Sequence, residues 1–183
     1  MKEFEVIKKW IEEVVIGLNL CPFAKRPYES GLIPIDTCFQ ENSDDRLEET
    51  LLKIEEMKLK GSEVISNRII IFPHAEKKFF DFLQFQSSVE DELFVLNWHD
   101  EFQLVAFHPD FQFENSHPND LENLVNSAPW PLLHILRTSE VLHAAQAQSS
   151  PEDIHDRNIR TLSRLTLDQL SHLFYWKSNL FKN

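Results

Sequence analysis

The sequence predicts an α/β or α+β protein in which helices pack on a small sheet of three to four strands and a helical tail follows at the C-terminal end. Three observations predict it: apolar residues recur at helical spacing near the N-terminus, a β-branched run spans Arg68 to Phe72, and helical segments alternate with strand-like ones. With 183 residues, 42% hydrophobic and 26% charged, the chain can bury one sizeable core. We therefore expect residues 1–183 to form a single domain.

The first half of the chain is expected to contain two helices and two strands. In order, these are an amphipathic helix at residues 3–19, a short strand at 32–39, a helix at 43–61 and a strand at 68–72. Ser43, Asp44 and Asp45 are expected to cap the second helix, and Gly61 to terminate it. The three consecutive isoleucines before Phe72 are typical of a strand buried on both faces.

The second half is expected to be mostly helical around one further strand. In order, we expect a helix at residues 76–96, a strand at 103–107, a polar loop at 108–119, and helices near 120–126, 131–137, 140–147, 151–163 and 166–181. Ser150 is the expected cap of the helix that starts at Pro151. The aromatic residues of the first of these helices are expected to be mostly core, namely Phe79, Phe80, Phe82, Phe85 and Phe94.

The charge of the chain limits its ligands. The net charge is −12, and residues 79–136 contain ten carboxylates and four histidines but no lysine or arginine. A nucleic acid would be repelled by this surface, so we expect no binding of nucleic acid at physiological salt. The ligand of this region is expected to be a small molecule that is neutral, cationic or bound through a metal.

Cysteine content and hydropathy indicate the compartment. Two cysteines are too few for the disulfide framework of a small secreted protein, and acidic residues occupy the N-terminus where a signal peptide is basic and then apolar. No window approaches ~18 consecutive apolar residues, the length of a membrane-spanning helix. We expect a cytoplasmic protein that does not enter a membrane.

A metal site is one hypothesis for the chemistry. His108 and Asp110 follow a predicted strand and His134 lies further along, which supplies two imidazoles and a carboxylate. Such a set binds a divalent transition metal, Fe(II), Mn(II) or Zn(II), with open positions. The leading hypothesis is a small-molecule enzyme whose site lies where the third predicted strand ends, with these three residues as metal ligands or as acid/base groups. Histidines in loops are more often structural residues, and in that alternative they only shape the loop.

Residues 126–137 are predicted to present further ligand-binding groups. Pro131 suits the first position of a helix, which would place His134 and Arg137 on one face. Arg137 and Asn126 are then expected to orient a substrate, although a salt bridge is the commoner use of such an arginine. The rival hypothesis is a noncatalytic binding module that docks a partner through the 108–119 loop and Trp130.

Cys21 is a candidate for a ligand-binding or nucleophilic residue. A thiolate paired with a histidine can act as a nucleophile. However, Leu20 precedes Cys21 and Pro22 and Phe23 follow it, an apolar setting that raises a thiol pKa. We expect Cys21 to be buried and unreactive.

Three segments of the sequence resemble a known family. They are Gly17 to Ala24 (GLNLCPFA), Phe107 to Phe113 (FHPDFQF) and Asn126 to Arg137, which ends PLLHILR. Together with Arg157-Asn158-Ile159 in the tail, they resemble the bacterial domain-of-unknown-function family 1415 over nearly the whole chain. The resemblance implies a shared fold and a bacterial origin, and no particular chemistry. Where the family pattern reads Asn-Arg-Ser-Pro-Tyr-Pro, this chain reads NSAPWP from Asn126, and so lacks a cation and a hydroxyl.

Overall fold

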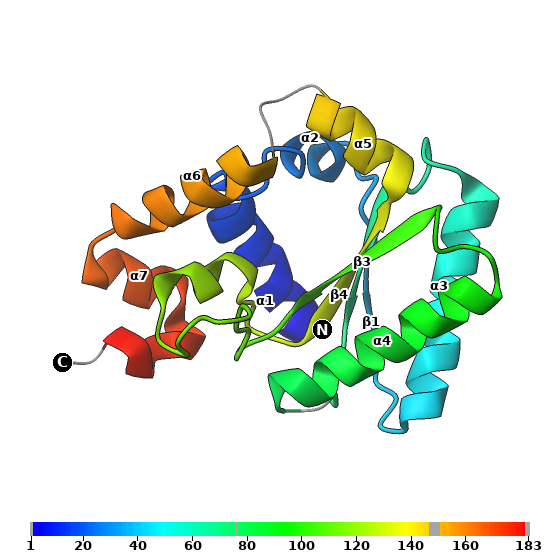
Figure 1. Ribbon diagram of the computed structural model, residues 1–183, viewed down its shortest axis with the longest axis horizontal. Helices are drawn as coiled ribbons and strands as arrows, with labels where there is room; N and C mark the ends of the chain where they lie inside the picture. The colour runs from blue at the N-terminus through cyan, green and yellow to red at the C-terminus, as the bar shows by residue number, and fades with distance from the viewer. Residues whose placement is uncertain (1, 76, 147–150, 182–183) are drawn as a thin grey trace.

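A four-stranded mixed sheet is the centre of the computed structural model, which describes residues 2–75, 77–146 and 151–181 (Figure 1). The strands are β1 (Ile35–Thr37), β2 (Asn67–Ile71), β3 (Phe102–Phe107) and β4 (Leu132–Arg137), in the spatial order β1-β2-β4-β3. Strand β1 is parallel to β2, whereas β4 runs antiparallel to both of its neighbours. The predicted fold, a small sheet with packed helices and a helical C-terminal tail, is confirmed.

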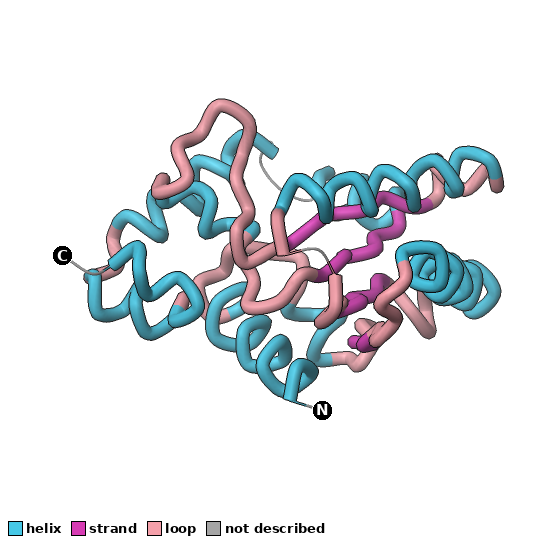
Figure 2. Tube along the Cα trace, turned by 90° about the horizontal axis from the view of Figure 1, so that it is seen from below, coloured by secondary structure: helices cyan, strands magenta, loops and turns pink. Residues whose placement is uncertain are grey.

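Helices cover both faces of this sheet, so that the strands lie between them (Figure 2). The helical elements are α1 (Lys2–Trp10), continued as the π-helix η1 (Ile11–Ile16), α2 (Lys25–Glu29), α3 (Ser43–Lys60), α4 (Phe79–Val95), η2 (Leu121–Asn126), α5 (Thr138–Gln146), α6 (Pro151–Ser163), α7 (Leu167–Leu173) and η3 (Tyr175–Phe181). None of the helices in the described part of the chain is long and apolar enough to cross a membrane.

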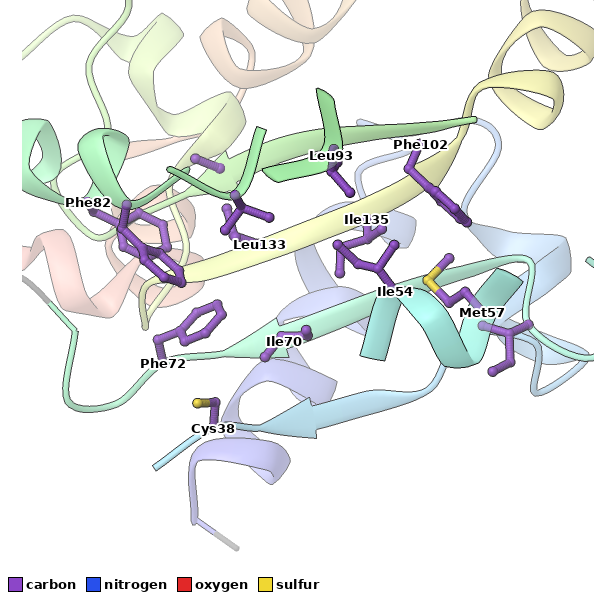
Figure 3. Close-up of a cluster of buried hydrophobic side chains, with 14 of the residues drawn as sticks. Cys38, Ile54, Met57, Ile70, Phe72, Phe82, Leu93, Phe102, Leu133 and Ile135 are labelled. Carbon is purple, nitrogen blue, oxygen red and sulfur yellow. The ribbon is translucent and has the colours of Figure 1, made fainter. Parts of the chain in front are cut away.

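One face of the sheet packs against α3 and α4. Alternate strand residues, among them Ile70 and Leu133, meet Ile54 of α3 and Phe82 of α4, and all four side chains are buried (Figure 3). Burying a side chain of this size contributes roughly 1.5–3 kcal/mol. This cluster fixes the two long helices on the sheet, and we call its side of the sheet the α3/α4 face.

The opposite face, here the α1/α6 face, packs against helices from both ends of the chain. Ile69 and Ile71 point to this side and form a cluster with Ile7 and Val14 from the first helix and Phe174 from the tail. Because β2 contributes apolar side chains to both clusters, all five of its residues are buried, as its β-branched run predicts. The N-terminal helix and the C-terminal tail therefore share one core.

Local signals at the helix ends agree with the structure in most places. Gly61, predicted to terminate α3, has a φ of 74°, a conformation that favours glycine. The N-cap of α3 is Asn42 rather than Ser43, because the Asn42 side chain accepts the Asp44 N–H at 2.7 Å. The predicted end of α5 at Ala147 and the predicted cap Ser150 lie outside the described residues.

The prediction of a helix at residues 131–137 is wrong, because Leu132–Arg137 is the strand β4. This segment pairs with β2 on one side and β3 on the other, so both of its faces are covered and its apolar residues show no simple alternation. Such a short apolar run has no period that separates strand from helix. As a consequence, His134 and Arg137 point to opposite faces of the sheet.

The phenylalanines of residues 76–96 were expected to be mostly core, and three of the five are buried. Phe79, Phe82 and Phe85 are buried against the sheet, but Phe80 and Phe94 are each 67% exposed. These two residues lie on the outer surface of α4, where no further element covers them among the described residues. Residues three and four apart share a helix face, so the buried set follows the helical period.

Candidate functional site

His108, Asp110 and His134, the predicted metal ligands, lie in different surroundings. His108 is 1% exposed and packs against Phe79 and Phe82 of α4, with ring centroids 5.7 and 5.8 Å away. Its Nδ1 accepts the Asp110 backbone N–H at 3.0 Å. His134 instead points to the α1/α6 face, because it is in register with Ile69. The sheet therefore separates the two imidazoles.

The carboxylate of this set is also engaged elsewhere. Asp110 is exposed, and its Oδ1 accepts a hydrogen bond from Lys177 Nζ at 3.0 Å. Within residues 2–75, 77–146 and 151–181, no group of three His, Cys, Asp or Glu side chains is close enough to hold a metal ion. His108, Asp110 and His134 are thus not brought together as one ligand set.

Arg137 stabilises the α3/α4 face. Its Nε donates to the Ile65 carbonyl at 3.1 Å, and its Nη2 donates to the Met57 carbonyl. The guanidinium also lies 5.3 Å from the centre of the Phe102 ring and 3.5 Å from Glu101. These contacts fix the end of β4 to the C-terminal part of α3. The partners of the guanidinium are thus groups of the protein.

Asn126 and Trp130 lie near His108 and not near His134. The Asn126 carbonyl accepts the His108 backbone N–H at 3.3 Å. Trp130 is half-buried and lines an open pocket of about 480 Å³ together with His108, His74 and Lys77. We call this hollow the Trp130 pocket.

Ser127 and Ala128, where the chain departs from the family pattern, are both buried. Ser127 Oγ accepts the indole N–H of Trp176 at 2.9 Å and donates to the Pro109 carbonyl at 3.3 Å. This hydroxyl joins the C-terminal η3 to the loop after β3. The substituted residues therefore have a structural role in this chain.

A larger pocket, of about 740 Å³, opens on the α1/α6 face between the turn that contains Cys21 and the sheet. Helices α2 and α5, neighbours at the top of Figure 1, both contribute to its wall. Most of the lining is apolar and includes Phe23, Ile33, Val105, Phe107, Leu136 and Val141. Because Cys21 and His134 both line it, we call it the Cys21–His134 pocket.

A chain of four polar side chains runs along the wall of this pocket. Ser66 Oγ donates its proton to the Glu140 carboxylate. Because a hydroxyl has only one proton, Ser66 Oγ is the acceptor in its hydrogen bond with Asn67 Nδ2, 3.4 Å away. Asn67 Oδ1 then faces His134 Nε2 at 2.7 Å. Since a carbonyl oxygen only accepts, Nε2 carries the proton of the neutral ring and Nδ1 is left as an acceptor. No partner of Nδ1 is found among the described residues.

Burial controls the charge of His134. The half-buried ring lies between Ile69 and Val105 on the neighbouring strands, and this burial lowers its pKa from 6.5 to about 4. The imidazole is therefore neutral at physiological pH. A neutral imidazole with one fixed N–H and one accepting nitrogen can take a proton from a bound molecule and return it.

Cys21 is half-buried in the same pocket, while the buried thiol of the chain is Cys38. The expectation that Cys21 is buried is thus wrong, because the turn after η1 leaves its side chain at the pocket wall. Burial still raises the pKa of the Cys21 thiol, although the backbone N–H groups of Phe23 and Ala24 and the positive charge of Arg157 act in the opposite direction. At neutral pH the residue is a thiol.

The turn that carries Cys21 is fixed by the C-terminal tail. Asn158 Nδ2 of α6 donates to the Leu20 carbonyl at 2.8 Å, and Arg157 donates to the Asn19 carbonyl at 3.0 Å. Asn19 has a φ of 53°, a left-handed conformation that Asn tolerates better than most residues. The tail therefore holds the thiol in place against the sheet.

Asn67, Ser66 and Glu140 are the pocket residues that the sequence did not indicate. Asn67 and His134 are 67 positions apart in the chain and meet only because β2 and β4 pair antiparallel. Asn67 precedes the isoleucine run and was the one available signal, since a polar residue at a buried strand position needs a partner.

Taken together, fold and site describe an α+β protein whose sheet carries a largely apolar pocket with a neutral histidine in its wall. The chain belongs to the family described as "Protein of unknown function (DUF1415)", whose model matches residues 3–172. The match covers the Cys21 turn, the four strands and α6, so the resemblance in the sequence is confirmed. No curated protein and no solved structure matches the chain.

Proposed function

We propose that the protein is a small-molecule enzyme whose active site is the Cys21–His134 pocket, and that His134 transfers a proton to and from the substrate. The supporting observation is the hydrogen-bonded chain from His134 through Asn67 and Ser66 to Glu140. It holds a neutral imidazole in one tautomer, at the cost of ordering three other side chains. Such fixing is what a general acid/base needs and what a merely packed histidine does not.

The lining of the pocket supports a small, largely apolar substrate. A volume of about 740 Å³ lies within the range of roughly 300–1,000 Å³ that is usual for small-molecule sites. Three charged residues belong to the lining: Arg137, whose guanidinium is bonded to backbone carbonyls, and Arg26 and Glu140, of which Glu140 is bonded to Ser66. A neutral molecule with one reactive polar group fits these walls best.

Two matched substitutions test where the ligand binds. Ala24 lines the Cys21–His134 pocket and Ala75 lines the Trp130 pocket, and both are half-buried. Ligand-observed NMR with a library of neutral fragments should give hits that Ala24→Trp removes and Ala75→Trp retains. The opposite result would favour the binding module that uses the Trp130 pocket, and an absence of hits with the wild-type protein would overturn the proposal.

The catalytic role of His134 needs a separate variant. His134→Gln keeps a hydrogen-bonding amide near Asn67 but cannot carry a proton. Fragment affinities should stay within about threefold, while turnover of any substrate found among the hits should fall by roughly 10²–10⁴, the usual contribution of a general acid/base. Turnover equal to that of the wild type would remove His134 from the mechanism.

A further inference from the structure

We infer that Cys21, His134 and Asn67 form a thiol-dependent acyl-transfer site for esters or thioesters with an apolar acyl group. Cys21 is the nucleophile, His134 is its general base, and Asn67 is a positioning residue that acts through His134. This inference rests on the proposed function, because it names the reaction and the substrate class of the same pocket.

The position of the three residues carries the inference. Cys21 from the turn after η1, His134 from β4 and Asn67 from β2 all line the Cys21–His134 pocket. Asn67 Oδ1 faces His134 Nε2 at 2.7 Å, so the nitrogen left to accept a proton is Nδ1. A thiol, an imidazole and an amide oxygen that orients the imidazole are the three groups that papain-like enzymes use, and this set recurs on unrelated folds.

Three groups near Cys21 offset part of the effect of burial on the thiol pKa. Backbone N–H groups of Phe23 and Ala24 point toward the sulfur, and the charge of Arg157 acts in the same direction. Burial has the larger effect and keeps the resting residue a thiol. The nucleophile is therefore generated only when a base removes the proton, and the only imidazole among the described residues that line this pocket is His134.

The reaction has two balanced steps. In the first, the Cys21 proton moves to His134 Nδ1, the sulfur bonds to the substrate carbonyl carbon, and the bond from that carbon to the alcohol or thiol breaks, with the proton passing to the leaving group. In the second, water attacks the thioester carbon while His134 takes a proton from it. The S–C bond breaks, the carboxylic acid leaves, and the proton returns to the sulfur.

The pocket walls determine the class of acyl group. The lining combines apolar side chains from the sheet, Val105, Phe107 and Leu136, with Val141 of α5. An unbranched or aromatic acyl chain would bury its carbons there at about 25 cal/mol per Å² of apolar surface. Short polar acyl groups gain little from the same walls.

Acylation by p-nitrophenyl hexanoate, followed by intact-mass spectrometry and peptide mapping, tests the inference. The wild-type protein should gain one hexanoyl group, on Cys21, and p-nitrophenyl acetate should react at least tenfold more slowly. Cys38 lies in the core of the α3/α4 face, so Cys38→Ala serves as the control that should still be acylated. Cys21→Ala should show no acylation while its circular dichroism and melting temperature remain those of the wild type.

The pH dependence of acylation shows whether His134 acts as the base that deprotonates Cys21. The charged residues around this site are Arg26 from α2, Arg137 from β4, Glu140 from α5 and Arg157 from α6, and the His134 pKa is about 4. A Cys21 thiol assisted by neutral His134 should react at a rate that is nearly constant from pH 5.5 to 8. In His134→Gln, only free thiolate reacts, so the rate should rise about tenfold per pH unit.

Asn67→Ala tests the positioning role with the same readout. Loss of the oxygen that fixes Nε2–H should slow acylation at least tenfold, and Asn67→Asp, which keeps an acceptor there, should recover most of the rate. If both variants react like the wild type, Asn67 does not position the base.

The outcomes distinguish this inference from the proposed function. Fragments that bind in the pocket of a protein whose Cys21 is never acylated would overturn the inference and leave the proposed function standing. Acylation at Cys38 or at a lysine, or a wild-type rate that rises tenfold per pH unit, would overturn it as well. No fragment binding and no acylation would overturn both.

Discussion

The buried polar groups on the two faces of the sheet differ in their hydrogen-bond partners. On the α3/α4 face, Arg68 bonds to Asp36 and Glu56, and Arg137 bonds to backbone carbonyls. On the α1/α6 face, His134 bonds to Asn67 and retains an accepting nitrogen beside a pocket. On the first face, two arginines attach helix α3 to the sheet. On the second face, the neutral His134 ring has a nitrogen that can accept a hydrogen bond from a ligand.

This difference shows how a buried polar residue can be assigned a role. Arg68 and Arg137 are both nearly inaccessible, and their partners are parts of the fold itself. The His134 partner, Asn67, is held in turn by Ser66, so the network orders a group that faces a cavity. The first arrangement stabilises the fold, and the second is the one on which the proposed function rests. Each of the following substitutions tests this difference.

The largest effect is expected within the core of the α3/α4 face. Phe82→Ala should reduce the free energy of unfolding by about 3–5 kcal/mol, because Phe82 is fully buried between α4 and the sheet. Its matched control, Phe80→Ala, removes a ring that is 67% exposed and should change stability by less than about 0.5 kcal/mol. Urea denaturation measures both, and equal losses would mean that α4 is oriented differently.

Breaking the ion pairs of Arg68 is the next largest effect. Arg68→Ala removes a buried guanidinium and its two charge-assisted hydrogen bonds to Asp36 and Glu56, so a loss of about 3 kcal/mol is expected. Lys53→Ala removes a more exposed partner of Asp36 and should cost less than about 1 kcal/mol. Fragment binding in the Cys21–His134 pocket should be unchanged by either variant, and weaker binding in Arg68→Ala would contradict the separation of the faces.

A pH-dependent loss of stability is expected from His134 on the α1/α6 face. Its pKa is lower in the folded protein, about 4 against 6.5, so the unfolded state binds more protons between these values. Stability should therefore fall by about 3 kcal/mol as the pH falls from 7 to 4. Urea denaturation of His134→Gln should lack this component. A difference between the two proteins that does not change with pH would show that His134 titrates normally.

The smallest predicted effect concerns the hydrogen bond that attaches α6 to the Cys21 turn. Asn158→Ala removes the donor to the Leu20 carbonyl and should cost about 1–2 kcal/mol. Labelling of Cys21 by iodoacetamide should become faster, because the turn loses its attachment to α6. Thr161→Ala, which removes a hydrogen bond within the same helix, is the control and should leave the labelling rate unchanged.

Much of the fold could be predicted from local sequence. The isoleucine run gave a strand buried on both faces, and Gly61 marked the end of α3. Strand β4 could not be recognised, since Pro131 followed by apolar residues fits the start of a helix as well as a strand between two neighbours. What decided it was pairing with β2 and β3, which no local pattern contains.

The candidate site was predictable only in part, for the same reason. The chemistry of their side chains makes Cys21 and His134 candidates, and both line the same pocket. The same argument makes His108 a candidate, but it packs against two phenylalanines on the other side of the sheet. The role of Asn67 depends on strand register, which becomes visible only once β2 and β4 are paired.

The state of the His134 ring tests the central claim most directly. Nitrogen-15 NMR of histidine-labelled protein, recorded from pH 7.5 to 4.5 and assigned with His134→Gln, reports the protonation of both ring nitrogens. We predict a protonated Nε2 and an unprotonated Nδ1 at neutral pH, with no titration above about pH 5. A ring protonated on Nδ1, or one that titrates near pH 6.5, would contradict the account of the α1/α6 face as a site poised for proton transfer.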